Sequence, residues 1–132
     1  MENSKEMREF LTISQKLIGA SLLFTDMEQS IFEINDNGEF DFSKKKITED
    51  LKNLKINEPI IKIGEDEVIP LLEEHNCEIK TELITPIFYN GKQFGFVAYH
   101  CQKGMFEEEH KAFANTAREF VEKIIAKEKE NI

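Results

Sequence analysis

The stretch "LITPIFYNGKQFGFVAYH", residues 83–100, decides the fold. At its centre, Asn90 and Gly91 separate two runs that are rich in Ile, Phe, Val and Tyr. Asn-Gly between such runs predicts a β-hairpin with a two-residue turn, because both central residues of that turn need a positive φ. The turn pairs Tyr89 with Lys92 and sets the register of the whole hairpin.

Both faces of this hairpin are mostly apolar, because side chains alternate between the two faces of a strand. The register places Thr85 opposite Phe96 and Pro86 opposite Gly95. We therefore expect the hairpin to lie in the middle of an antiparallel sheet that is covered on both sides. We assign the face with Pro86, Gly95 and Val97 to helices, because a small residue lets a helix approach closely.

The rest of the chain supplies the covering elements. Apolar residues at helical spacing predict a first helix from near Met7 to a stop at Gly19. The other expected elements, in order, are strands at residues 21–26 and 30–34, a short helix at 48–54, a strand at 59–64, a helical turn at 66–76 that Pro70 interrupts, and a long helix from 106 to 130. This order predicts an α+β fold with the terminal helices on one face of the sheet and the middle segment, residues 40–76, on the other.

Composition bounds the function. A chain of 132 residues fits one domain, and 40% hydrophobic with 33% charged residues is typical of a globular protein. No apolar run is long enough to span a membrane, and we expect no membrane partner. Two cysteines, with no signal-peptide layout, favour the cytoplasm. The net charge of −9 argues against direct binding to nucleic acid.

Three quoted segments carry a resemblance to a known family. "ELITPIFYNGKQFGFVAYH" and "FEEEHKAFANTAREFVEKII" resemble the closing hairpin and the final helix of a GAF domain. "SLLFTDMEQSIFEI" more narrowly resembles the start of the C-terminal GAF-like domain of stage V sporulation protein T. The resemblance covers roughly residues 5–127, and it implies a single GAF-like (PAS/GAF-type) domain over residues 1–132.

The same resemblance implies a function. It implies a regulatory domain that senses a small molecule or another signal, dimerises through its terminal helices and acts through a protein partner in transcriptional or sporulation-type regulation. In that family a DNA-binding domain precedes the sensing half. Here about one helix precedes the first strand, so we expect that half to be missing and the chain to make no direct contact with nucleic acid.

Enzymatic and metal-binding alternatives have weaker support. His75, Cys77, His100 and Cys101 are of the ligand types that zinc prefers, but their spacing matches no standard zinc pattern. A redox role like that of the GAF-type free methionine sulfoxide reductases needs cysteines that this chain does not supply convincingly. The Asn-Lys-Phe-Asp-Glu signature of cyclic-nucleotide binding is absent, as are GxSxG and HExxH. We expect no enzyme, no cofactor and no metal.

Two function classes stay open, a ligand sensor and a dimerisation scaffold whose pocket is filled. A pocket between the sheet and residues 40–76 would favour the sensor. If the pocket is present, we expect its lining to come from the residues of the hairpin and the middle segment that the helices leave uncovered. They are Phe40, Phe42, Ile61, Ile63, Leu71, Leu72, Thr85, Phe96 and His100.

The long helix suggests how two copies would associate. Its apolar stripe must be buried, and the helix is longer than a sheet of three or four strands can cover. We expect the end from Phe120 to Ile125 to overhang the sheet and to be buried in a helix bundle between two copies.

Overall fold

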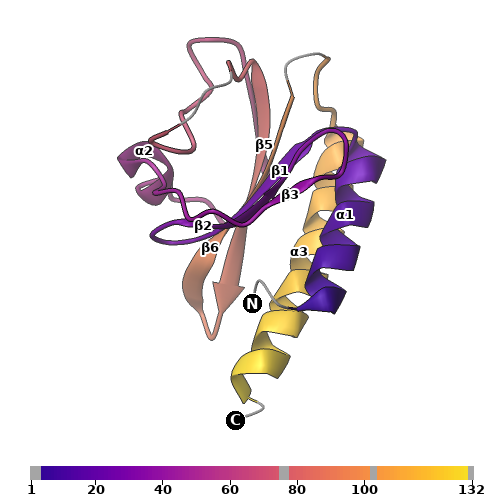
Figure 1. Ribbon diagram of the computed structural model, residues 1–132. Coiled ribbons are helices and arrows are strands. Elements are labelled where there is room, and N and C mark those ends of the chain that lie inside the picture. The colour runs from indigo at the N-terminus through magenta and orange to yellow at the C-terminus, as the bar shows by residue number, and fades with distance from the viewer. Residues whose placement is uncertain (1–3, 75–77, 102–103, 131–132) are drawn as a thin grey trace.

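The computed structural model describes residues 4–74, 78–101 and 104–130. Two long helices lie side by side on one face of a curved sheet, and a short helix lies on the other side (Figure 1). The elements, in order, are α1 (Lys5–Ile18), β1 (Ser21–Asp26), β2 (Ser30–Ile34), β3 (Phe40–Asp41), α2 (Glu49–Lys52), β4 (Ile60–Ile63), β5 (Thr81–Tyr89), β6 (Lys92–Cys101) and α3 (Glu108–Glu130). The predicted α+β, GAF-like arrangement is confirmed.

The six strands form one antiparallel sheet in the order β3-β2-β1-β6-β5-β4. The predicted hairpin, β5 with β6, occupies two of the inner positions of this sheet. Its strand β6 pairs with β1, so the first and last strands of the chain meet at the centre. The hairpin is therefore covered on both faces, as its composition indicates.

Local sequence signals place the helix ends. The Ser4 side chain accepts a hydrogen bond from the Met7 amide at 3.1 Å and caps α1. Gly19 ends the helix with φ 76°, a left-handed conformation that suits glycine. Thr48 caps α2 in the same way, by accepting from the Leu51 amide at 3.1 Å.

The hairpin register departs from the predicted one at a β-bulge. The two pairs next to the turn form as predicted, but Ile87 pairs with Gly95 rather than with Phe94. Phe94 is the extra residue that a bulge leaves without a partner. Every later residue of β6 is therefore shifted by one position relative to β5, which our prediction did not foresee.

The shift corrects the assignment of the faces. Pro86 pairs with Phe96, and Phe96 lies in the core on the side of the middle segment. Thr85 pairs with Val97, and Val97 lies in the core under the helices. The predicted grouping of Pro86 with Gly95 on the helix face is therefore wrong, although Gly95 and Val97 do face the helices.

Position 95 requires glycine for a different reason from the one we expected. A Cβ atom on Gly95 would lie 1.9 Å from the backbone oxygen of Thr25 and 2.7 Å from Cα of Asp26. Both atoms belong to the neighbouring strand β1, not to a helix. The close approach of two strand backbones therefore requires glycine at this position.

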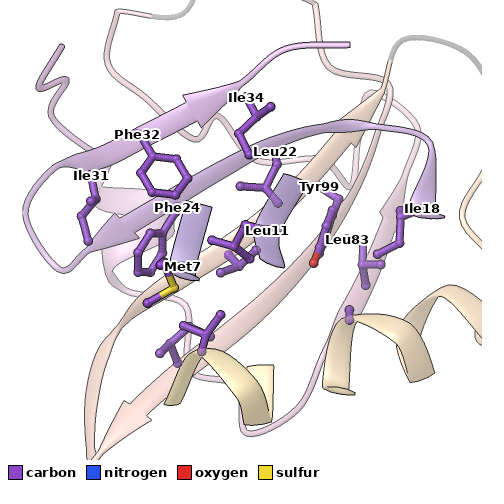
Figure 2. Close-up of a cluster of buried hydrophobic side chains, with 14 of the residues drawn as sticks. Met7, Leu11, Ile18, Leu22, Phe24, Ile31, Phe32, Ile34, Leu83 and Tyr99 are labelled. Atoms are coloured by element: carbon purple, nitrogen blue, oxygen red, sulfur yellow. The ribbon is translucent and has the colours of Figure 1, made fainter. Parts of the chain in front are cut away.

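Two apolar cores lie on opposite faces of the sheet. In the core under the helices, Met7 and Leu11 of α1 contact the sheet close to Phe24 and Leu22 of β1 (Figure 2). On the other face, a smaller core gathers Leu23, Ile47, Leu51, Leu71, Leu72, Ile84, Phe96 and Ala98. The middle segment is thus packed onto the sheet as predicted.

The two terminal helices also pack on each other. Phe10 of α1 stacks on Phe120 of α3, with 4.0 Å between the ring centroids. Val121, Ile124 and Ile125 are buried in the core of the same chain. The expected overhang from Phe120 to Ile125 is therefore wrong, because α1 and the sheet cover this part of α3.

The predicted helical turn at residues 66–76, interrupted by Pro70, forms only before the proline, and residues 75 and 76 lie outside the described residues. The chain makes one turn, in which the Val68 amide donates to the Gly64 carbonyl at 3.0 Å. Residues 69–74, which we call the strap, then run without helical structure. Pro70 lies in the strap and cannot donate the amide hydrogen bond that a continuing helix would need.

Candidate functional site

A polar cavity of about 390 Å³ lies where β1, β2, β3 and β6 meet the end of the strap. Glu33 pairs with Leu23, which belongs to the smaller core under the middle segment. Paired residues point to the same face of a sheet, so the cavity lies on the face opposite the helices. Its lining consists of Ser21, Leu22, Glu33, Ile34, Asn35, Glu39, Phe40, Asp41, Lys45, Glu74 and His100.

One wall is held in place by a buried serine. Ser30 in β2 donates its hydroxyl to the Ser43 carbonyl at 3.1 Å and accepts from the Lys45 amide at 2.9 Å. Its own amide donates to the Lys45 carbonyl at 2.8 Å. These three bonds hold the segment after β3 against the sheet and bring the side chain of Lys45 to the cavity.

Lys45 forms the main ion pair of the cavity. Its ammonium lies 2.6 Å from a carboxylate oxygen of Glu33 and 3.1 Å from one of Asp41. The hydrogen bond to Glu33, and then that to Asp41, raise the pKa of Lys45. Hydrogen bonds from the side chain and the amide of Ser43, followed by that from Lys45, lower the pKa of Asp41 to about 2. Lys45 and Asp41 therefore stay charged at neutral pH.

The remaining walls add further polar groups. The carboxylate of Glu39 accepts a hydrogen bond from the Asn35 side chain at 3.3 Å. Glu74 comes from the end of the strap, and His100 comes from β6. The cavity therefore combines four carboxylates, one ammonium group and one imidazole, a set of groups that can orient a small polar molecule.

Two of the nine residues predicted to line a pocket do so. Phe40 of β3 and His100 of β6 both line the polar cavity. Leu71, Leu72 and Phe96 are buried in the core under the middle segment, where they fill the space in which we expected an apolar pocket.

The other four predicted residues lie elsewhere. Ile61 and Thr85 are on the sheet face that the helices cover, because Ile61 pairs with Leu83 of that core and Thr85 with Val97. Ile63 is 43% exposed on the edge strand, and Phe42 is 42% exposed beside the ring of Phe40. The structure thus does not bring the nine together, and ligand binding by any of them stays a prediction.

The ionic residues of the cavity were missing from our prediction. Glu33 and Asp41 pair across β2 and β3, so they point to the same face. A sequence signal existed, since Asp41 alternates with Phe40 and Phe42 in a strand pattern. That Lys45 would reach both carboxylates depends on the Ser30 contacts, which no local pattern indicates.

The structure describes only some of the His and Cys residues that the sequence offers as possible metal ligands. His75 and Cys77 lie outside the described residues. Within residues 4–74, 78–101 and 104–130, no group of three or more His, Cys, Asp and Glu side chains is placed to hold a metal ion. In the same ranges, no helix is long and apolar enough to cross a membrane.

The outer face of the helix pair carries exposed apolar side chains. Ile13 and Leu17 of α1 are 55% and 63% exposed, and Phe113 of α3 is 47% exposed. The helices run in opposite directions (Figure 1). Leu17 and Phe113 are each seven residues, or two turns, from the stacked Phe10–Phe120 pair, so they lie at about the same level.

Comparison with known proteins identifies a matching family and solved structures of similar fold, of which one is described here. The family described as "Stage V sporulation protein T C-terminal, transcription factor" matches residues 4–126. The chain is also similar to the crystal structure of a domain of a protein described as a two-component sensor histidine kinase from Sinorhizobium meliloti 1021. That match has a TM-score of 0.51 and 13% identity, and it covers 97% of each chain. No curated protein matches the sequence.

Proposed function

The chain belongs to the family of C-terminal domains of stage V sporulation protein T, and we propose that it is a regulatory domain that senses a small molecule. In this proposal it acts in the cytoplasm through a protein partner, in transcriptional or sporulation-type regulation. The net charge of −9 supports a partner that is a protein rather than nucleic acid. No catalytic step is proposed.

The polar cavity is the observation that carries this proposal. A volume of about 390 Å³ is in the range of small-molecule sites. Its walls come from the sheet, from loop residues that include Lys45, and from Glu74 of the strap. A bound molecule would therefore contact two parts of the fold that are distant in sequence, which is what a ligand needs in order to change their relative stability.

Native mass spectrometry tests the proposal directly. The protein is incubated with the small-molecule fraction of a cell extract, desalted and weighed without denaturation. We expect an adduct of a few hundred daltons, roughly the size that such a cavity accepts. Ser21→Trp, which fills the cavity, should abolish the adduct, and Thr116→Trp, exposed on α3 outside the lining, should keep it. A wild-type protein without any adduct contradicts the sensor function.

We also propose that two copies associate through the terminal helices. The exposed side chains of Ile13, Leu17 and Phe113 support this surface, in place of the buried end of α3. In a closed dimer with two-fold symmetry, each copy would cover the same stripe on the other. Such burial removes apolar area from water without any change in the fold of either copy.

Sedimentation equilibrium at micromolar concentration tests the dimer. We expect the wild-type chain to be a dimer and Leu17→Glu with Phe113→Glu to be a folded monomer, because two unpaired charges would enter the interface. Lys127→Glu, an exposed change at the end of α3, serves as the control and should remain dimeric. A monomeric wild-type protein rules out this assembly.

A scaffold without a ligand is the second candidate function. The observation that favours it is the filled core under the middle segment, where Leu71, Leu72 and Phe96 leave the predicted apolar pocket occupied. The two experiments above separate the candidates. A dimer with no adduct supports the scaffold, and a dimer with an adduct that Ser21→Trp removes supports the sensor.

A further inference from the structure

Glu82 is a buried carboxyl group in the strand next to the edge of the sheet. It lies in β5 and has no exposed surface. Its Oε1 accepts a hydrogen bond from the amide of Ile69, the first residue of the strap, at 2.5 Å. Its Oε2 is also buried and has no hydrogen-bond partner in the described part of the chain. A buried polar atom without a partner is rare in proteins and calls for an explanation.

The strap connects Glu82 to the cavity. Residues 70–73 are tied to the segment before α2, where Thr48 donates its hydroxyl to the Pro70 carbonyl at 2.6 Å and its amide to the Leu71 carbonyl at 3.1 Å. The bond from the Ile69 amide to Glu82 attaches the beginning of the strap to the sheet. Five residues later, Glu74 forms part of the cavity wall.

We propose that Glu82 is a proton-dependent anchor of the strap. In its neutral form the carboxyl holds Ile69 against the sheet, and in its ionised form it favours release of the strap and opening of the cavity wall that Glu74 supplies. The regulatory meaning of this opening rests on the proposed function of the cavity. The anchor itself does not, because its opening can be measured without a ligand.

The physical reason is the cost of a buried charge. Burial raises the pKa of Glu82 to about 7, against the lowering effects of the Ile69 amide and of the charge on Lys62. When the carboxyl ionises in the closed state, one oxygen has neither water nor a donor. Release of the strap lets water reach that oxygen, so the open state is favoured at higher pH.

Two ionisable residues of the described part of the chain pair with Glu82 from the neighbouring strands. Lys62 lies directly across on β4, and His100 lies directly across on β6. The Ile69 amide is the strap's contact with the carboxyl. Histidine also changes its charge between pH 5 and 8, so an experiment must separate the two groups.

Hydrogen exchange of the strap amides, measured by mass spectrometry, provides the test. After correction for the intrinsic effect of pH on exchange, the opening constant of the strap in the wild-type protein should rise about tenfold from pH 6 to pH 8. Glu82→Gln keeps the acceptor for Ile69 but cannot ionise, so its opening constant should not change with pH. Glu73→Gln alters an exposed carboxylate in the same strap and should behave like the wild type.

Two results would overturn the proposal. One is a Glu82→Gln protein whose strap keeps the tenfold rise, since another group such as His100 would then be responsible. The other is a wild-type strap whose protection is independent of pH. If Glu82→Gln does not fold, ¹³C NMR titration of the wild-type carboxyl decides instead, and a midpoint below pH 5 refutes the anchor.

Discussion

Replacing Gly95 with alanine should destabilise the domain far more than a single methyl group usually does. The new carbon would lie 1.9 Å from the Thr25 carbonyl oxygen, whereas such atoms do not approach within 3.0 Å. Backbone atoms block it, so no side-chain rotation relieves the overlap, and β1 and β6 must separate locally by about 1 Å. Overpacking of this kind costs about 1 to 3 kcal/mol, and two weakened strand hydrogen bonds add about 1 kcal/mol each.

We therefore expect Gly95→Ala to lower the free energy of unfolding by about 4 kcal/mol, a large part of the stability of a typical domain. In thermal unfolding followed by circular dichroism, this corresponds to a fall in Tm of about 15 °C. The control is Gly38→Ala. At Gly38 a Cβ meets nothing within 4 Å and the left-handed φ of 80° is the remaining obstacle, so the expected cost is about 1 kcal/mol. A Gly95→Ala protein no less stable than Gly38→Ala would refute the reasoning.

Three further changes test other parts of the fold. The pKa of Glu82 is raised in the folded state, so the stability linked to its proton is present at low pH and is lost as pH rises through about 7. In urea unfolding, the free energy of unfolding of Glu82→Gln should therefore rise by about 2 kcal/mol relative to that of wild type between pH 5 and pH 8. A difference between the two proteins that does not change with pH would contradict the burial of this acid. Ile124→Glu places a charge in the core under the helices and should abolish cooperative thermal unfolding at pH 7. A variant that still folds would contradict the burial of this part of α3 and support the predicted overhang. Tyr99→Phe removes the hydroxyl that donates to Ser14 at 3.1 Å and should cost about 1 kcal/mol in chemical unfolding, with a cost above 3 kcal/mol pointing to a larger network.

Most of the fold follows from signals that act over a few residues. Asn90 and Gly91 give the hairpin turn, with φ values of 52° and 75°. Ser4 and Gly19 bound the first helix. Each of these signals has a local physical cause, a positive φ or an unpaired amide, and therefore does not depend on the rest of the chain.

The errors have a different origin. The bulge at Phe94 has no signal in the alternation of apolar residues, because both faces of the hairpin are apolar and either register looks acceptable. The one-residue shift then moves Thr85 from the expected pocket to the helix face. The overhang predicted for α3 was wrong because the length of a helix does not show how much of it a second helix covers.

The candidate site was less predictable than the fold. Phe40 and His100 are the two predicted residues that line the cavity, and both lie on strands. The ion pairs of Lys45 with Glu33 and Asp41 join a loop to two strands, and charged residues in such positions look like an ordinary solvated surface. Only the tertiary contacts of Ser30 distinguish this lysine from its neighbours.

The pairing of β1 with β6 has a consequence for how the chain folds. Thr25 and Phe96, which are joined by a hydrogen bond, are 71 residues apart in sequence. Closing so long a loop is entropically costly and is repaid only after both halves of the sheet have formed, which places folding among the slower small domains. During synthesis β1 leaves the ribosome long before β6 and exposes an unpaired edge in the meantime. A nascent chain of this protein should therefore need protection from aggregation until its last strand has emerged.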